Sequence, residues 1–128
     1  MKDEKGYVQN RSKEFAIRIV KCCEFLVREH GEHIMSKQLL RAGTSIGANI
    51  AEAEFAQSSA DFYSKLSISL KESSETRYWL ELLYNTQYLS KEQFESMLED
   101  INIIISILVK IVKNKDCEKH SIIGNFTE

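Results

Sequence analysis

Residues 38–57, QLLRAGTSIGANIAEAEFAQ, and residues 61–83, DFYSKLSISLKESSETRYWLELL, decide the fold. In both stretches apolar residues recur every three or four positions, which is the period of an amphipathic helix. We therefore predict one helix over about residues 33–55 and another from Ser58 or Ser59 to about Tyr84. Their apolar residues are Ile34, Leu39, Ile46, Ile50 and Ala53 in the first, and Phe62, Leu66, Leu70, Leu80 and Tyr84 in the second.

Two glycines, Gly43 and Gly47, interrupt the first of these helices. Glycine inside a helix costs about 1 kcal/mol relative to alanine, so both positions need a structural reason. Their spacing of four residues places them on one face of the helix. This pattern predicts either the close approach of another helix or a bend.

One further helix is predicted before this pair in the sequence, and another after it. The first begins near Asn10 or Ser12 and ends at Gly31, a suitable left-handed cap. The last opens at Ser90, because Ser90 and Gln93 have the spacing of a capping box, and it ends near residue 113.

These four helices define the expected architecture. The chain contains no proline, and four helices joined by short linkers pack most simply as an up-down-up-down bundle. We predict an all-α, antiparallel four-helix bundle over residues 1–113, followed by a C-terminal tail at residues 114–128.

Composition limits the class of protein. The 128 residues are 43% hydrophobic and 28% charged, as expected for one soluble globular domain. Seventeen basic and nineteen acidic residues leave a net charge of −2, which excludes a general attraction to polyanions. The most apolar stretch, residues 101–112, is shorter than the roughly 20 residues of a membrane span. The three cysteines lack metal-ligand spacing, so we predict a reduced, cytoplasmic protein without a membrane partner.

The last helix is apolar on two sides. Its apolar residues cover an arc of roughly 200°, wider than the usual apolar stripe. We interpret the excess as a subunit interface of a ring-like homo-oligomer, although the C-terminal tail is an alternative cover. The interface residues predicted on this basis are Ile101, Ile104, Ile107, Leu108 and Ile111.

The first helix carries a basic stripe. Arg11, Arg18, Lys21 and Arg28 project within roughly 100° of one another. Such a stripe is usually a solvated face. In a ring, however, symmetry would repeat it into a band able to contact the phosphates of RNA or DNA.

A second polar stripe follows the helix over residues 33–55. Its residues are Gln38, Arg41, Ser45, Asn49 and Glu52. It is interpreted either as a solvated face or as a buried polar network or channel lining. Arg77 projects to the apolar side of the next helix, so we predict a buried salt bridge with Glu52, Glu54 or Glu81.

The sequence shows none of the residue patterns of known four-helix-bundle active sites. The sequence has no Glu-x-x-His pair, and its three histidines lie at linker or tail positions. Cys22 and Cys23 fall on the inward arc of the first helix, as small buried residues do. We predict a protein that is not an enzyme, with no catalytic residue, cofactor, metal or small-molecule substrate.

The segments SIGANIAEA and KESSETRYWL resemble a four-helix-bundle family first met as proteins encoded by intervening sequences inside 23S ribosomal RNA genes. The related accessory variability determinants of diversity-generating retroelements share that fold. The resemblance spans about residues 12–112 and implies a subunit of a homopentameric ring. By this resemblance the motif positions are Ser45, Asn49 and Glu52, then Glu72, Glu75, Arg77, Tyr78 and Trp79. The resemblance attaches no catalytic role to them.

Two functions follow from these observations. The first is a non-enzymatic, ring-forming scaffold for a protein or RNA partner. The second is a nucleic-acid-binding accessory factor that binds RNA, a reverse transcriptase, or both, through the basic stripe.

Overall fold

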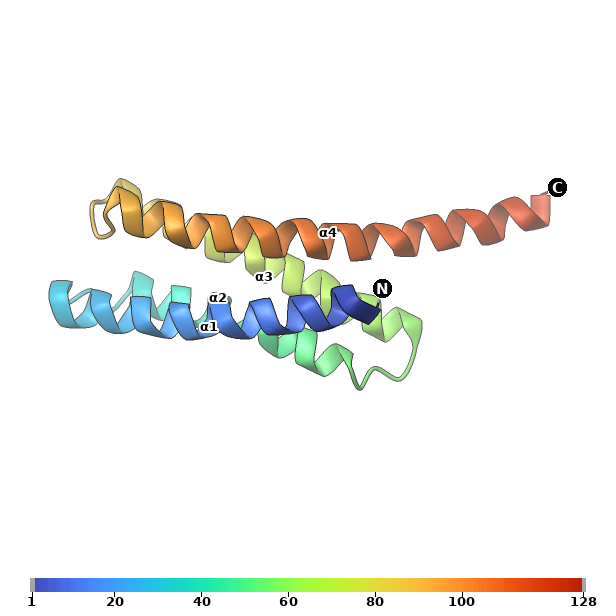
Figure 1. The fold of residues 1–128 in the computed structure, drawn as a ribbon, viewed down its shortest axis with the longest axis horizontal. Coiled ribbons are helices and arrows are strands. Elements are labelled where there is room, and N and C mark those ends of the chain that lie inside the picture. The colour runs from blue at the N-terminus through green and yellow to red at the C-terminus, as the bar shows by residue number, and fades with distance from the viewer. Residues whose placement is uncertain (1, 128) are drawn as a thin grey trace.

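The computed structural model describes the backbone of residues 2–127 and the side chains of residues 6–115. It contains four helices: α1 (Lys2–His30), α2 (Met35–Ala53), α3 (Ser59–Asn85) and α4 (Lys91–Thr127). No strand occurs within residues 2–127 (Figure 1). The predicted all-α class and the four predicted helices are therefore confirmed.

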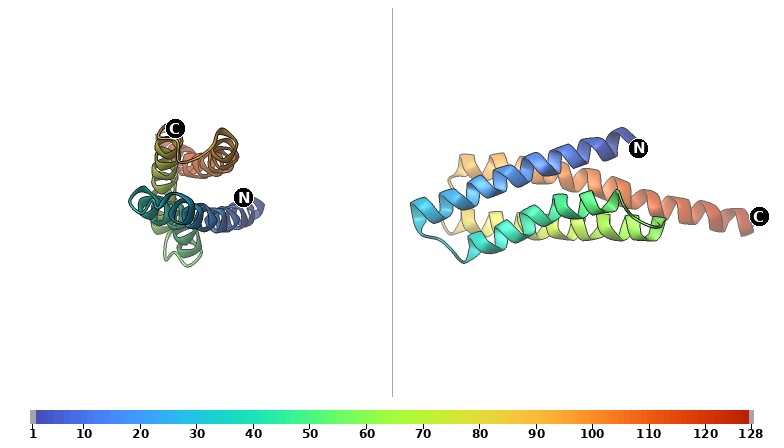
Figure 2. Two further views of the ribbon diagram at one scale, coloured as in Figure 1. Left: turned by 90° about the vertical axis from the view of Figure 1, so that its left-hand side faces the viewer. Right: turned by 90° about the horizontal axis from the view of Figure 1, so that it is seen from below.

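Each helix packs against its neighbours in the sequence. Contacts join α1 to α2, α2 to α3 and α3 to α4, and a thinner contact joins α4 back to α1. The loops α1–α2 and α3–α4 lie at one end of the molecule, and the loop α2–α3 lies at the other (Figure 1). The view along the helices shows the four of them arranged around a common centre (Figure 2).

Local capping interactions define the helix ends. Gly31 ends α1 with a φ of +62°, as predicted. At the start of α4, Ser90 N–H donates to Gln93 Oε1 at 2.8 Å and Gln93 N–H donates to Ser90 Oγ at 3.1 Å. This confirms the capping box. The Ser58 hydroxyl accepts from Asp61 N–H at 3.1 Å and caps α3.

The start of α2 has a cap that the sequence analysis missed. The Glu32 carboxylate is 8% exposed and accepts hydrogen bonds from the backbone N–H groups of Ile34, Met35 and Ser36 at 2.7–3.1 Å. Burial by itself would raise the pKa of Glu32. The three N–H donors outweigh it and lower the pKa below its usual value, because they stabilise the carboxylate.

Two helix limits differ from the prediction. α1 begins at Lys2 instead of residues 10–12, and α4 continues past residue 113 to Thr127. Neither added segment contains proline, the residue that most strongly interrupts a helix. The end of α4 projects beyond the other helices (Figures 1 and 2). The predicted C-terminal tail is residues 114–128, and the side chains of its residues 116–128 lie outside the described ones.

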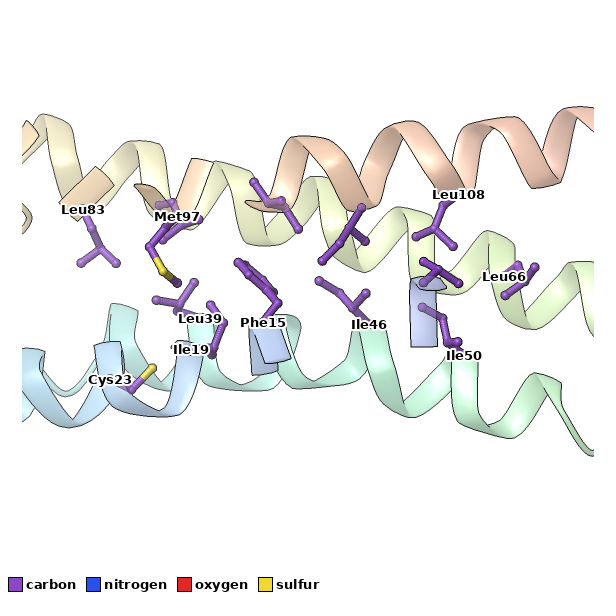
Figure 3. Packing of buried hydrophobic residues seen from close by; sticks show 14 of the residues in the cluster. Phe15, Ile19, Cys23, Leu39, Ile46, Ile50, Leu66, Leu83, Met97 and Leu108 are labelled. Carbon is purple, nitrogen blue, oxygen red and sulfur yellow. The ribbon is translucent and has the colours of Figure 1, made fainter. Parts of the chain in front are cut away.

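The core runs along the centre of the bundle, with residues from all four helices. Phe15 of α1, Leu39 and Ile46 of α2, and Leu83 of α3 are essentially inaccessible to solvent. Figure 3 shows labelled core side chains pointing into the space between the helices, spread along the bundle from Leu83 and Met97 at one side of the view to Leu108 and Leu66 at the other.

The two glycines of α2 face α1. A Cβ atom on Gly43 would lie 2.7–2.9 Å from three side-chain carbons of Ile19, and one on Gly47 would lie 3.3 Å from Ser12 Oγ. Real Cβ atoms do not tolerate the first distance. The glycines therefore allow the close approach of another helix, which was one of the two predicted reasons for them.

The apolar arc of α4 is buried within the single chain. Ile101, Ile104, Leu108 and Ile111 are 0–1% exposed in the core, and only Ile107 is half-buried. The first four therefore do not present an open face to a second subunit, which corrects that expectation. The physical reason is position: α4 packs against α3 on one side and α1 on the other, so a wide arc is covered within the monomer.

Candidate functional site

The basic stripe of α1 is divided by contacts with α4. Arg11 Nη2 lies 3.4 Å from Asp100 Oδ1, and Arg18 donates to the other carboxylate oxygen of Asp100. Arg18 also donates to Ser96 Oγ at 2.7 Å. Both arginines are partly buried, at 28% and 39% side-chain exposure. Two of the four stripe cations therefore hold α1 to α4.

The other two stripe residues, Lys21 and Arg28, are exposed. Arg28 Nε lies 3.0 Å from Glu29 Oε1 on the same helix. Lys21 lines a hollow of about 280 Å³ between α1 and α4, together with Arg18 and Phe25. The four cations thus do not form a continuous band of uncompensated charge.

The polar stripe of α2 lies along the seam with α3. Arg41 Nη1 donates to Glu72 Oε2 at 2.9 Å, and Arg41 Nη2 donates to Glu75. Lys65 Nζ lies 3.2 Å from Glu52 Oε1. Glu72 and Glu75 of α3 therefore bind Arg41 of the polar stripe on α2, which joins the two stretches quoted at the outset.

The smaller members of this stripe bond within α2. Ser45 Oγ donates to the Arg41 carbonyl at 2.6 Å, and Asn49 Nδ2 donates to the Ser45 carbonyl at 2.8 Å. Gln38 is exposed, and Ser45 and Asn49 are half-buried. The stripe is therefore a half-exposed seam between two helices in the single chain.

Arg77 does not make the predicted buried salt bridge. Its Nη1 donates to the Asn102 side-chain carbonyl of α4 at 3.0 Å, and the residue is partly exposed. An arginine side chain is long enough to lay its stem on apolar neighbours while its guanidinium reaches the surface. The helical projection gave the direction of Arg77 but not its depth.

An exposed apolar groove between α1 and α2 was not predicted. It encloses about 610 Å³, and its apolar lining includes Val20, Val27 and Leu40. These side chains are 39–42% exposed, and Ile17, one turn away on α1, is 51% exposed. The spacing of residues 17, 20 and 27 is a helical spacing, so a second projection of this helix would have shown the stripe.

Charged groups surround this groove. Arg28 and Lys37 belong to its lining together with His33, and Glu24 is its one carboxylate. Because Arg28 is paired with Glu29, the groove combines an apolar centre with charged groups of both signs at its edge, as surfaces that contact other macromolecules often do.

Neither cysteine with a described side chain is an activated nucleophile. Burial raises the pKa of the Cys22 thiol to about 11 and that of Cys23 to about 12, so neither forms a thiolate readily. Cys23 Sγ lies 3.2 Å from the Ser36 carbonyl, as a packed core residue. Among residues with described side chains, no group of three possible metal ligands comes together. None of the helices, within their described residues, has the length and apolarity needed to cross a membrane.

Comparison with known proteins agrees with this geometry. The family model of the 23S rRNA-intervening sequence proteins matches residues 4–110. A 1.70 Å crystal structure of a protein of unknown function, from the S23 ribosomal protein family of Bacteroides thetaiotaomicron VPI-5482, is 55% identical in sequence. The match covers 86% of this chain and 98% of that chain, with a TM-score of 0.85. No curated protein matches the chain significantly.

Proposed function

The chain belongs to the family of 23S rRNA-intervening sequence proteins, and we propose that it is the subunit of a ring-like homo-oligomer that acts as a non-enzymatic scaffold. Each subunit would be an antiparallel up-down-up-down bundle, and the ring a cytoplasmic homopentamer. Its partner would be a protein or an RNA, as in the retroelement accessory proteins that the sequence resembles.

One observation carries this proposal: the bundle completes its core and still exposes an apolar surface. Ile17, Val20, Val27 and Leu40 lie together on α1 and α2 and are 39–51% exposed. Apolar patches of this kind on small proteins mark interaction sites. An oligomer that covered them would remove this surface from water.

Light scattering during size-exclusion chromatography tests this function. A mass close to five times the 14.8 kDa of one chain supports the pentamer. A dimer, trimer or tetramer at micromolar concentration would refute the pentamer but retain the homo-oligomer. The monomer mass would refute the proposal.

The nucleic-acid-binding alternative receives less support from the geometry. Asp100 already compensates Arg11 and Arg18, and Glu29 lies beside Arg28. A salt titration with a fluorescent single-stranded RNA tests it, because phosphate contacts give affinity that falls steeply with salt. If RNA binds with such a slope, and the triple variant Arg18→Gln, Lys21→Gln, Arg28→Gln abolishes binding without changing the oligomer mass, the accessory-factor function is correct.

A further inference from the structure

We propose that the end of the bundle at the α3–α4 loop binds a nucleoside monophosphate. The site is a hollow of about 770 Å³, called the loop-end hollow below, at the end of the molecule that holds the α1–α2 and α3–α4 loops (Figure 1). It is defined by rings and amides from α1, α3 and the α3–α4 loop: Phe25, His30, Tyr84, Asn85, Gln87 and Tyr88. All of these residues belong to one chain, so the site is independent of the proposed homo-oligomer.

Gln87 has a backbone conformation that glycine normally adopts. Its φ is +70°, the only positive φ of a residue other than glycine in the part of the chain that the structure describes. Gln87 N–H donates to the Tyr84 carbonyl at 3.0 Å and Tyr88 N–H to the Leu83 carbonyl at 2.9 Å, which is the Schellman pattern at the end of α3. α1 ends with Gly31 in the same left-handed conformation. A glutamine kept where glycine is favoured points to a use for its side chain.

The amides of the loop-end hollow have unused hydrogen-bonding groups. Asn85 and Gln87 are exposed, and neither side chain makes a hydrogen bond to another described residue. Gln93 accepts from Ser90 N–H through Oε1 at 2.8 Å, which leaves its Nε2 donors for a ligand. A primary amide presents a donor beside an acceptor, and the edge of a nucleobase such as adenine offers the matching pair at N7 and N6.

Aromatic rings give the hollow a surface for a flat ligand. The rings of Tyr84 and Phe94 are stacked, with an interplanar angle of 3° and a centroid distance of 4.5 Å. Tyr84 lines the hollow and Phe94 does not, so a planar ring in the hollow would continue this stack on the side away from Phe94. His30 contacts Phe25 and Tyr88 edge to face, each at 5.5 Å, which holds these further rings in place. Stacking on such rings is how proteins commonly bind nucleobases.

A lysine lies beside the hollow, where a phosphate can reach it. The hollow of about 280 Å³ between α1 and α4 shares lining residues with the loop-end hollow, Leu89 among them, so the two adjoin. Lys21 lines the smaller hollow and makes no ion pair with a described residue. Arg18 lies there too, but Asp100 already compensates it. Lys21 therefore supplies one uncompensated positive charge, which suits one phosphate group.

This distribution of charge favours a single nucleotide over a strand of RNA. The described residues that line the loop-end hollow include no lysine, arginine, aspartate or glutamate, so the part of the ligand that lies there is uncharged. A strand of RNA carries a phosphate at every nucleotide, and Lys21 alone does not match such a series of charges. A nucleoside monophosphate combines one flat ring that has polar edges with one anionic group, which is what the two hollows together offer.

Isothermal titration calorimetry of the full chain with adenosine 5′-monophosphate (AMP) tests this site, and we expect saturable binding of one AMP per chain. Gln87→Gly is the decisive variant, because glycine suits the left-handed backbone and removes the amide. Its melting temperature should equal or exceed that of the wild type, whereas its affinity for AMP should fall about fivefold or more. A Gln87→Gly protein that binds AMP as tightly as the wild type would show that the glutamine serves only the loop.

Further variants separate the ring from the phosphate. Tyr84→Leu should lower the affinity for AMP and for adenosine alike, about fivefold or more, because the stacking surface is lost. Lys21→Gln should lower the affinity for AMP about fivefold or more and leave the affinity for adenosine unchanged. Lys13→Gln removes another exposed lysine of α1 that lines neither hollow, and it should bind AMP as the wild type does. Circular dichroism should show wild-type helix content in each variant.

The outcomes are distinct from those of the proposed function. A monomeric wild type that binds AMP supports the site and refutes only the homo-oligomer. A wild type without saturable AMP binding up to about 1 mM would overturn the site whatever its mass. Unchanged AMP affinity in both Gln87→Gly and Tyr84→Leu would place any bound AMP elsewhere and overturn it too. Binding of a 5′-phosphorylated RNA oligonucleotide without binding of AMP would overturn the single-nucleotide site and favour the accessory-factor function.

Discussion

Replacing Gly43 with alanine should destabilise the bundle, although the same change stabilises most helices. The added Cβ would meet Cγ1, Cδ1 and Cγ2 of Ile19 at 2.7, 2.9 and 2.9 Å. Ile19 is 0% exposed, and its β-branched side chain has one strongly preferred rotamer in a helix. Relief of the overlap therefore requires α1 and α2 to move apart.

The magnitude follows from two opposing effects. Alanine gains about 1 kcal/mol over glycine in the helix interior. Overpacking a filled core costs about 1–3 kcal/mol. Because two of the three overlapping carbons, Cγ1 and Cγ2, are bonded directly to Ile19 Cβ and cannot move away without a change of rotamer, we take the upper part of that range. The free energy of unfolding should then fall by about 1–2 kcal/mol.

Urea unfolding at a fixed protein concentration measures this change, with the slope m compared to exclude a change in the unfolded state. Gly47→Ala is the matched control. Its Cβ would approach Ser12 Oγ to 3.3 Å and two backbone atoms of Ser12 to 3.5 and 3.6 Å, so stability should stay within about 0.5 kcal/mol of wild type or rise. In the background Ile19→Ala, which removes the overlapping carbons, Gly43→Ala should become stabilising. A Gly43→Ala protein as stable as wild type would refute the close approach of α1 and α2.

Two further variants test side chains whose roles the structure defines. Arg77→Ala should lower the free energy of unfolding by no more than about 1 kcal/mol, because a partly exposed hydrogen bond to Asn102 is lost and no buried ion pair is broken. A loss above about 2 kcal/mol in urea unfolding would instead support the buried salt bridge. Glu32→Gln should remove part of the α2 cap and lower stability by about 1 kcal/mol at pH 7. The pKa of Glu32 is lower in the folded chain than its usual 4.5, so the wild-type contribution is complete above that pH and is lost as pH falls through the folded value. The difference between the two proteins should therefore shrink on acidification, and a constant difference from pH 7 to pH 3 would contradict this role of the carboxylate.

Helices and their caps were predictable because their signals are local. The Ser90–Gln93 capping box and the left-handed Gly31 depend on residues within one turn, and both occur as predicted. The cap made by Glu32 is equally local, but glutamate is not among the residues that usually cap a helix N-terminus. A glutamate placed just before the first turn of α2 was the signal for it.

The arrangement of faces was harder to predict, because it depends on which helices become neighbours. The wide apolar arc of α4 indicated an uncovered side, yet α1 and α3 cover Ile104 and Leu108 completely. The uncovered apolar side instead belongs to α1, where Val20 and Val27 stand among charged residues that masked their spacing. Ion pairs between distant residues, such as Arg18–Asp100, cannot be recognised in a single sequence, because 82 residues separate the partners.

The thin contact between α1 and α4 has a consequence for the order of folding. The other three contacts join consecutive helices through short loops, so each of them forms between nearby segments and with little loss of chain entropy. The Arg11–Asp100 pair spans 89 residues and closes the circle of helices. We therefore expect a transition state in which α2 and α3 are already docked and the seam between α1 and α4 is still open. A substitution at Asp100 should then accelerate unfolding and leave the folding rate almost unchanged.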